Sequence, residues 1–276
     1  MSKPFSMIVF PNAKINIGLH VLERRSDGYH NIETLFYPVP WCDILEVVPK
    51  QDQKITLTLS GLPVPGDKED NFIVRCYNDL IKDFALPGLA IHLHKNIPIG
   101  GGLGGGSSNV AFFMKTLNTQ FDLGMSKEEM AARVVVYGSD CPFFIYNKPM
   151  LGSGIGDKLK EIAVNIRGRY VQLVNPNIHV STAEAYANLV PESKRKSLSE
   201  VLERKLNNWQ ALLQNDFEKT VFSLHPELKK IKEVLYRSGA VYAAMSGSGA
   251  TCYGIFKKKP SKLNFPEHFQ TKLVAL

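Results

Sequence analysis

The chain has 276 residues, of which 44% are hydrophobic and 21% are charged, and its formal net charge is +7. This length and composition predict a globular protein with a sizeable core and one or two domains. They exclude a membrane-spanning protein, because no run of about 18 apolar residues occurs, and a disulfide-stapled secreted fold, because the four cysteines are widely spaced and too few. We therefore expect a cytoplasmic protein with reduced thiols and no membrane contact.

The first sixty residues are predicted to form strands. Residues 15–23 alternate apolar with polar or small side chains over much of their length, and residues 55–60 alternate strictly, which is typical of a half-buried sheet. From Asp70 the pattern becomes helical, because apolar residues recur at intervals of three and four as far as Phe84. Asp70 or Asn71 is placed to cap this helix.

Residues 89–94 are predicted to form a short strand that leads into a glycine-rich loop, and an apolar helical stripe from Val110 to Phe121 follows the loop. The order of strand, glycine loop and helix is the main pattern of this region. Further helices are expected where the capping-box pattern Ser-x-x-Glu occurs, at Ser126, Ser181 and Ser197.

After about residue 155 the chain is expected to be mainly helical. Pro226 suits the first turn of a helix that ends at Gly239. A strand over residues 241–245 and a second glycine turn over residues 246–249 follow this helix. Because strands come first and helices later, the pattern predicts an α+β protein with two lobes.

The glycine loop is predicted to bind phosphate. Glycine permits positive φ and lets the backbone approach a ligand closely, and the helix that starts near Ser107 has unsatisfied N–H groups with a partial positive charge. Ser107 and Ser108 add hydroxyls that would cap the helix, bond a phosphate or contact Mg²⁺. The residues predicted to hold the phosphates are Pro98, Ile99, Gly100, Gly101, Gly102, Leu103, Gly104, Gly105, Gly106, Ser107 and Ser108.

Three other interpretations of this loop are less consistent with its surroundings. A flexible linker would not usually lie between a strand and a well-formed amphipathic helix. A dinucleotide-binding loop is a closer rival, since GxGxxG can be threaded through the glycines, but the preceding strand is short and no alternating βαβ series follows. A Walker P-loop would need Gly-Lys-Ser/Thr where this sequence has Gly-Ser-Ser.

Three segments together resemble the GHMP kinase superfamily, which includes galactokinase, homoserine kinase and mevalonate kinase. They are residues 11–16 (PNAKIN), the loop 98–108 and residues 245–250 (MSGSGA), which span nearly the whole chain in this order. The resemblance implies a two-lobed α+β fold whose first lobe is like ribosomal protein S5 domain 2 and whose second lobe is ferredoxin-like. We expect these lobes to be an ATP-binding domain at residues 1–155 and a C-terminal domain at residues 156–276.

Within the superfamily the sequence is most similar to the branch whose acceptor is 4-diphosphocytidyl-2-C-methyl-D-erythritol. The similarity lies in residues 13–16 (AKIN), 27–30 (DGYH), 100–109 (GGGLGGGSSN) and 138–144 (GSDCPFF). It implies transfer of a phosphoryl group from ATP, with Mg²⁺, to the 2-hydroxyl of that compound in non-mevalonate isoprenoid biosynthesis. A kinase of homoserine or mevalonate is the alternative within the superfamily.

A basic nucleic-acid-binding protein is the alternative from a different class, because the isoelectric point is near 9.1. The basic runs are short, however, and aromatic residues are not interleaved with them. We therefore expect a small-molecule substrate and no nucleic acid, with the protein acting as a monomer or a weak homodimer.

The resemblance places Lys14 and Asp140 together as the catalytic pair. Asp140 would accept the proton of the acceptor hydroxyl, and Lys14 would hold that hydroxyl, keep Asp140 ionised and offset negative charge on the transferred group. Asp140 acting chiefly as an electrostatic anchor stays open. From the sequence alone, Asp140 also fits a turn residue and Lys14 an outward-facing side chain of a strand.

The same resemblance implies contacts to the acceptor. Tyr29 would stack on the cytosine ring, His30 would bind its polar edge and Asn16 would contact the acceptor near its hydroxyl. Tyr186 is a candidate for the second stacking face, with Thr182 beside it, although plain core packing of Tyr186 fits as well.

Further contacts are predicted on both substrates. The second glycine turn would direct N–H groups and hydroxyls at the acceptor phosphates, and a simple strand-initiating turn is the alternative. Mg²⁺ would be held mainly by the ATP phosphates, with Ser108 as an additional candidate ligand. The residues expected at the ribose or adenine are Lys95, Asn96 and Asn71, and those of the turn are Ser246, Gly247, Ser248 and Gly249.

Overall fold

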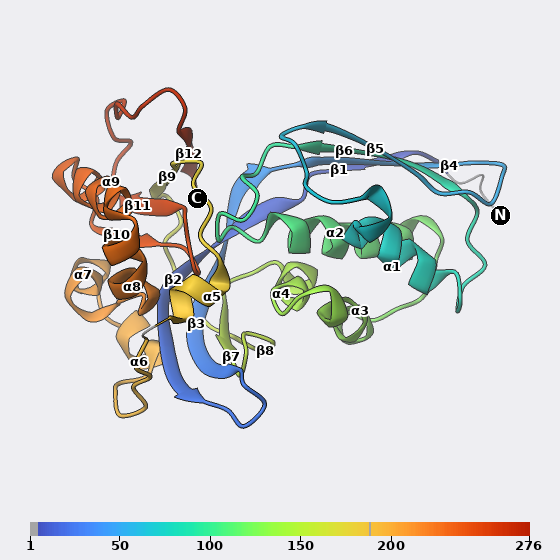
Figure 1. The fold of residues 1–276 in the computed structure, drawn as a ribbon. Coiled ribbons are helices and arrows are strands. Elements are labelled where there is room, and N and C mark those ends of the chain that lie inside the picture. The colour runs from blue at the N-terminus through green and yellow to red at the C-terminus, as the bar shows by residue number, and fades with distance from the viewer. Residues whose placement is uncertain (1–4, 188) are drawn as a thin grey trace. The chain divides into compact units, whose positions relative to one another are not determined.

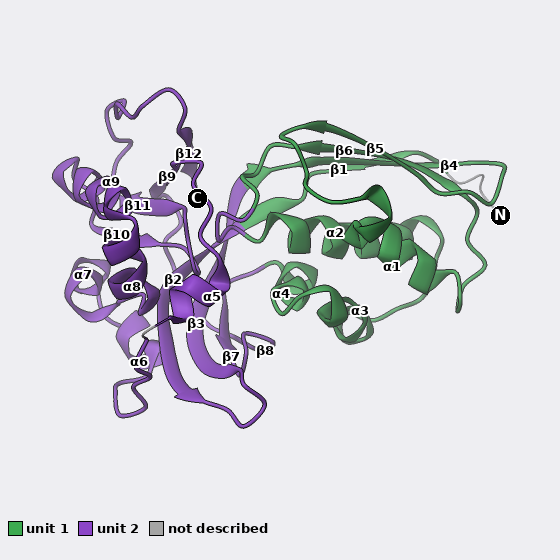
Figure 2. Ribbon diagram, viewed as in Figure 1, with its two compact units in different colours: residues 1–13, 41–99, 104–147 green, residues 14–40, 100–103, 148–276 purple. Residues whose placement is uncertain are grey.

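The structure is a computed structural model that describes residues 5–187 and 189–276 (Figure 1). The chain divides into two compact units (Figure 2): unit 1 comprises residues 1–13, 41–99 and 104–147, and unit 2 comprises residues 14–40, 100–103 and 148–276. Neither unit is continuous in sequence, and the glycine loop contributes to both. The expected boundary between residues 155 and 156, which separates two continuous sequence domains, stays a prediction.

Unit 1 contains a four-stranded sheet with the order β1-β4-β6-β5. Pairing is antiparallel except between β5 and β6, which are parallel. Helices α1 and α2 lie along one face of this sheet (Figure 1). The elements of unit 1 are β1 (Met7–Val9), β4 (Ile44–Pro49), β5 (Thr56–Gly61), η1 (Lys68–Asp70), α1 (Phe72–Leu80), β6 (Leu89–Lys95), α2 (Gly105–Gln120), α3 (Lys127–Val134), η2 (Val135–Tyr137) and α4 (Cys141–Tyr146).

Local sequence signals account for the helices of unit 1. The side chain of Asn71 caps α1 by accepting a hydrogen bond from the N–H of Ile73, and Ser126 opens α3 with a complete capping box. Both caps are as predicted. α1 ends at Leu80, however, and does not continue to Phe84, because residues 81–83 form turns instead of a further helical turn.

Unit 2 contains an antiparallel sheet with the order β10-β11-β9-β12. Helices α8 and α9 pack against each other, and α9 also contacts β10 and β11. The elements from residue 170 onward are β9 (Tyr170–Asn175), α5 (Thr182–Tyr186), α6 (Leu198–Leu202), η3 (Leu206–Asn208), α7 (Trp209–Leu212), α8 (Phe217–Leu224), α9 (Pro226–Arg237), β10 (Tyr242–Met245), β11 (Cys252–Phe256) and β12 (Gln270–Ala275).

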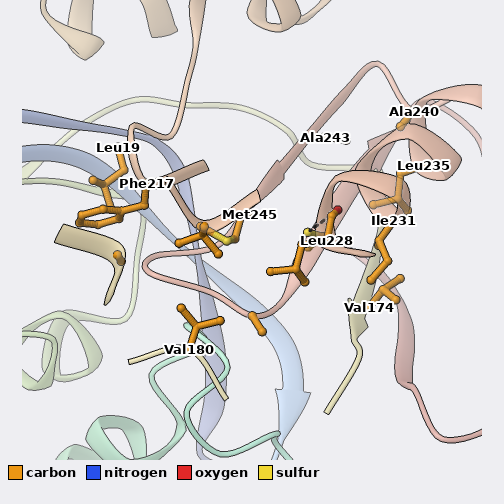
Figure 3. Close-up of a cluster of buried hydrophobic side chains, with 14 of the residues drawn as sticks. Leu19, Val174, Val180, Phe217, Leu228, Ile231, Leu235, Ala240, Ala243 and Met245 are labelled. Carbon is orange, nitrogen blue, oxygen red and sulfur yellow. Dashed lines mark hydrogen bonds between the residues drawn. The ribbon is translucent and has the colours of Figure 1, made fainter. Parts of the chain in front are cut away.

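The core of unit 2 joins these helices to the sheet (Figure 3). Leu228, Ile231 and Leu235 form the buried stripe of α9. Phe217 at the start of α8 and Met245 at the end of β10 belong to the same cluster, so both segments are anchored in one core.

A third sheet has the order β2-β3-β7-β8 and lies mainly in unit 2. Its strands are β2 (Asn12–Arg24), β3 (His30–Cys42), β7 (Met150–Ser153) and β8 (Lys158–Glu161). β2 includes the predicted strand of residues 15–23 and carries Lys14 and Asn16. Every residue of β2 from Ala13 to Val21 is buried, because both faces of the strand are covered.

The expectation of a mainly helical segment after residue 155 missed β8, β9, β11 and β12. All of β11 and all but the first residue of β9 are buried, and a strand buried on both faces shows no alternation in its sequence. The capping box expected at Ser197 is also wrong. The Ser197 hydroxyl accepts from the N–H of Ser199 and donates to Glu33 instead. No helix in the described part of the chain is long and apolar enough to cross a membrane.

Candidate functional site

The head of α2 in unit 1 has the backbone geometry of an anion site. Gly104 precedes the helix in the left-handed conformation with φ of 68°, and Ser108 is the first residue whose N–H returns to Gly104 O, at 2.8 Å. The N–H groups of residues 105–107, in the first turn of α2, therefore have no carbonyl partner within the helix. A Cβ on Gly106 would meet nothing within 4 Å, so the approach to these donors is open. An anion is stabilised in such a position.

Two serines extend this site. The Ser108 hydroxyl is buried and has no hydrogen-bond partner among the described residues, which is costly unless a ligand supplies one. Ser107 Oγ and Cys141 Sγ both lie beside Gly138, 3.5 and 3.6 Å from its Cβ position. Burial raises the pKa of the Cys141 thiol to about 12. The head of α2 is therefore beside the segment that contains Asp140, which is half-buried at the start of α4.

Lys95 and Asp43 form a buried ion pair near this helix end, with side chains 4% and 0% exposed. Lys95 Nζ also donates to Asn109 Oδ1 at 3.1 Å, and the Asn109 amide donates to Asp43 Oδ2 at 2.8 Å. The other Asp43 oxygen accepts the backbone N–H groups of Asn96 and Ile97 at 2.7 and 2.8 Å. Burial lowers the pKa of Lys95, and the charge of Asp43 opposes this shift. The network thus holds the chain where it enters the glycine loop.

The Lys95 ammonium lies 3.2 Å from the Cβ position of Gly105, so it supports the loop from behind. Its expected contact with the nucleotide stays a prediction. The Asn96 side chain is exposed and donates to Cys42 O at 3.2 Å, whereas Asn71 is occupied in capping α1. Of the first loop residues, Pro98 is buried and Ile99 is 43% exposed.

In unit 2, Lys14 and Asn16 form a buried polar cluster on β2. Lys14 Nζ donates to Asn16 Oδ1 at 2.6 Å and lies 5.3 Å from the centroid of the Phe36 ring. The Asn16 amide donates to Thr34 Oγ1 at 3.0 Å. Tyr253 donates to the main-chain oxygen of Asn16 at 2.7 Å. The bonds to Lys14 and Thr34 fix the Asn16 side chain with its oxygen toward the lysine.

The second glycine turn and the first half of the glycine loop are adjacent in unit 2. Ser246 Oγ donates to Gly102 O at 2.8 Å and accepts the N–H of Asn16 at 3.2 Å. Gly102 has φ of 74°, and a Cβ there would lie 2.0 Å from Ser246 O. The N–H of Lys14 donates to Leu103 O at 3.0 Å. Gly247 lies at the same contact, because its Cβ position is 3.6 Å from Gly102 Cα.

Backbone hydrogen bonds hold the residues on either side of this contact between the loop and the turn. Thr251 N–H donates to Gly101 O at 3.2 Å, and Gly249 N–H donates to Ser246 O at 3.0 Å. Gly100 has φ of 65° and faces the His179 ring, while Ser248 is half-buried. The structure therefore brings Lys14, Asn16, the loop residues 100–103 and the turn together within unit 2.

The predicted cytosine contacts form an aromatic group in unit 2. The rings of His30 and Tyr186 are stacked, with centroids 4.5 Å apart and an interplanar angle of 19°, and Phe217 meets Tyr186 edge-on at 4.8 Å. Tyr29 is 62% exposed, and Thr182 is exposed at the start of α5. One Tyr186 face is thus covered by His30, while Tyr29 is accessible for stacking.

The predicted pairing of Lys14 with Asp140 joins residues of different units and stays a prediction. The sequence analysis missed four polar residues of these clusters, namely Asp43, Asn109, Thr34 and Tyr253. Asn109 closes the motif 100–109, but no role is predicted for it; Asp43, Thr34 and Tyr253 lie in no motif and are distinguished only by their burial. Within the described residues no group of three or more His, Cys, Asp or Glu side chains is arranged to hold a metal ion. The unpartnered Ser108 hydroxyl next to an anion site nevertheless fits a contact to Mg²⁺ carried by phosphates.

Comparison with known proteins identifies two family matches. Residues 71–148 match the model of the GHMP kinase N-terminal domain, and residues 189–273 match that of the GHMP kinase C-terminal domain. Together these matches cover more than half of the chain.

Relatives match over nearly the full length. The 4-diphosphocytidyl-2-C-methyl-D-erythritol kinase of Cytophaga hutchinsonii is 49% identical over 255 residues, which are 92% of this chain and 94% of the relative. A crystal structure of 4-(cytidine 5'-diphospho)-2C-methyl-D-erythritol kinase has a TM-score of 0.79 at 27% identity and covers 98% of this chain and 99% of that one. The homoserine kinase of Cytophaga hutchinsonii, with a TM-score of 0.65 at 16% identity over 100% of this chain and 96% of its own, shares the fold.

Proposed function

Because the chain belongs to the GHMP kinases, in the family of the 4-diphosphocytidyl-2-C-methyl-D-erythritol kinases, we propose that it phosphorylates the 2-hydroxyl of that cytidyl compound with ATP. The expected two-lobed α+β fold, with one lobe like ribosomal protein S5 domain 2 and one ferredoxin-like lobe, is that of its family. GHMP kinases take the phosphoryl group from ATP. The product would enter non-mevalonate isoprenoid biosynthesis.

The observation that carries the proposal is the position of the α2 head beside the Asp140 segment in unit 1. Ser107 Oγ lies 3.5 Å from the Cβ position of Gly138, two residues before Asp140. A triphosphate held by the α2 amides would thus have its terminal group close to a carboxylate. Phosphoryl transfer depends chiefly on such positioning and on neutralising charge.

On the donor side, the free N–H groups of residues 105–107 and the Ser107 and Ser108 hydroxyls would hold the ATP phosphates. Mg²⁺ would neutralise charge on the β- and γ-phosphate oxygens, with Ser108 as the protein group that fits it. Lys95 and Asp43 would act behind the loop by fixing its backbone.

On the acceptor side, Lys14 would bind the 2-hydroxyl oxygen while Asn16 holds the ammonium in place at 2.6 Å. Asp140 would accept the hydroxyl proton as the oxygen attacks the γ-phosphorus, or anchor Lys14 electrostatically. The positive charge of Lys14 would also offset negative charge that develops on the transferred group.

Recognition of the cytidyl diphosphate would use the aromatic group and the turn. Tyr29 would stack on the cytosine, and His30, fixed against Tyr186, would contact the polar edge of the base. The N–H groups and hydroxyls of residues 246–249 would bind the diphosphate, and Thr182 would contribute from the start of α5.

The expected localisation, oligomeric state and domain boundary are part of the same proposal. We propose that the protein acts in the cytoplasm without nucleic acid, as a monomer or a weak homodimer. We also propose that its two sequence domains meet between residues 155 and 156, a position that falls between the family matches at 71–148 and 189–273.

The proposal is tested by coupled ADP release with a panel of acceptors. We expect turnover with 4-diphosphocytidyl-2-C-methyl-D-erythritol and Mg²⁺, and none with homoserine or mevalonate. Activity on mevalonate with indifference to the cytidyl compound would assign the chain to the alternative class of GHMP kinase.

The catalytic pair is tested by Asp140→Asn and Lys14→Met. Each change should lower kcat about 100-fold or more, because general acid–base and electrostatic groups typically contribute at least that factor, while ATP binding by equilibrium titration is retained. Asp67→Asn is the matched control for Asp140→Asn, since Asp67 also directly precedes a helix in unit 1. Full activity of Asp140→Asn would remove that residue from the mechanism.

A further inference from the structure

The segment Gln214–Glu218 in unit 2, here named the clamp, lies after α7 and includes the first two residues of α8. It contacts both β2 and the second glycine turn. Three of its side chains are bonded to main-chain atoms of other segments. None of them belongs to a motif that the sequence analysis identified.

The clamp binds β2 along its backbone. Leu19 N–H donates to Gln214 O and Asp216 N–H donates to Leu19 O, both at 2.9 Å, which forms a parallel bridge between Leu19 and Asn215. Asp216 Oδ2 accepts the N–H of Val21 at 2.7 Å. β2 is the strand that carries Lys14 and Asn16.

The clamp binds the second glycine turn through Asn215. This side chain is 3% exposed, and its amide group donates to both Met245 O and Gly247 O at 2.8 Å. Its oxygen accepts the N–H of Phe217 at 3.0 Å, so the amide is fully committed and its orientation is fixed. Glu218 Oε1 accepts the N–H of Met245 at 2.8 Å. Both flanks of Ser246 are therefore held from one segment.

Ser246 is the residue between these two anchored carbonyls, and its hydroxyl joins Asn16 to Gly102. A turn of two glycines has little conformational preference of its own, so its shape must be imposed from outside. Asn215 imposes it, because an amide that donates to two carbonyls two residues apart permits only one spacing between them.

We infer that Asn215 is a positioning residue for the acceptor, which fixes the second glycine turn in register with β2 so that the N–H groups of Gly247 and Ser248 meet the acceptor diphosphate. The N–H groups of Ser246 and Gly249 donate within the protein instead, to Thr251 O and Ser246 O. Asp216 and Glu218 complete the attachment on either side. The inference rests on the proposed function for its ligand, a cytidyl-linked diphosphate, but its structural part concerns the turn alone.

Two Asn215 variants test it by steady-state kinetics. Asn215→Ala removes both donors, and Asn215→Asp places a carboxylate oxygen against two carbonyls. Because each lost or repulsive buried contact weakens the turn, we expect the KM for the acceptor to rise about tenfold or more in both variants. The KM for ATP should change less than about twofold, since the ATP phosphates are assigned to α2.

Tyr236→Phe is the matched control. It also removes a side-chain hydrogen bond to a carbonyl of β10, from Tyr236 to Ala243 O at 3.1 Å, but that carbonyl precedes the turn. Its KM for the acceptor should stay at the wild-type value. The positioning role would be overturned if Tyr236→Phe raised the KM for the acceptor as much as Asn215→Ala does. It would also be overturned if Asn215→Ala raised the KM values for the acceptor and for ATP equally.

A second readout is independent of the substrate. In Asn215→Ala, amide hydrogen exchange should accelerate about tenfold or more at Ser246 and Gly249, whose N–H groups donate to Thr251 O and Ser246 O, while exchange of Ala243 and Ala244 should not change. Unchanged exchange at the turn would refute the inference even if the enzyme were active. If the wild type has no activity on the cytidyl compound but the turn exchanges faster in the variant, the proposed function fails and the clamp stands.

Discussion

Replacing Gly102 with alanine would force apart the loop and the turn that meet in unit 2. The new Cβ would lie 2.0 Å from Ser246 O and 3.1 Å from Gly249 O. Since such contacts are essentially never shorter than 3.0 Å, the turn or the loop must move by roughly 1 Å. Both neighbours at the short contacts are backbone oxygens, so no side-chain rotation can relieve them.

Two costs add in Gly102→Ala. An L-residue in the left-handed region costs about 1–2 kcal/mol, and overpacking adds about 1–3 kcal/mol. Gly100→Ala separates them, because Gly100 has a similar φ of 65° but its nearest neighbour is a side-chain atom of His179 at 3.4 Å. We therefore expect Gly102→Ala to lower the free energy of unfolding by about 1–3 kcal/mol more than Gly100→Ala.

Urea unfolding of the two variants measures this difference, and acceptor kinetics measure its consequence. A displacement of about 1 Å near reacting groups lowers turnover about 100-fold, so kcat/KM for the acceptor should fall by that order in Gly102→Ala. Equal unfolding free energies for the two variants, together with wild-type turnover, would show that the close approach of loop and turn is not part of the working site.

Two further predictions concern buried charge. Lys95→Met should lower the free energy of unfolding by about 3–5 kcal/mol, because it leaves the charge of Asp43 without its ion-pair partner. The control Lys82→Met, which removes an exposed ion pair with Asp79, should lower it by less than about 1 kcal/mol. Adding Asp43→Asn to Lys95→Met should restore part of the lost free energy, and no recovery in urea unfolding would contradict the ion-pair role. Burial lowers the pKa of His20 from 6.5 to about 4, so the unfolded chain binds the proton more readily and stability should fall as pH drops from 6.5 toward 4. His20→Gln should flatten this pH dependence in unfolding titrations, and an unchanged slope would show that His20 does not cause it.

The local parts of the fold could be predicted because they depend on neighbours in sequence. The glycine loop leads into α2, Asn71 caps α1, and the Ser126 and Ser181 capping boxes are complete. Each of these features is decided by residues within one or two helical turns. The buried strand β9, in contrast, owes its conformation to β11 and β12 on its two sides.

Only those parts of the site that belong to sequence motifs could be predicted. The phosphate loop and the turn at Ser246 are visible as glycine patterns, but Asp43 is a single acidic residue whose partners follow 52 to 66 positions later. The donor groups of Asn215 lie 30 and 32 residues before the carbonyls that they bind. Such bonds follow from tertiary packing, and no local propensity indicates them.

The attachment of the clamp to β2 also determines when this part of the structure can form during translation. Val21 and its partner Asp216 are 195 residues apart, and a ribosome adds about 5–20 residues per second. β2 emerges among the first residues, yet it waits on the order of 10–40 seconds for the segment that completes it. During translation β3 is made directly after β2 and lies next to it in the sheet, but the opposite edge of β2 stays unpaired until the clamp is made. The acceptor side of this protein is therefore completed only late in synthesis.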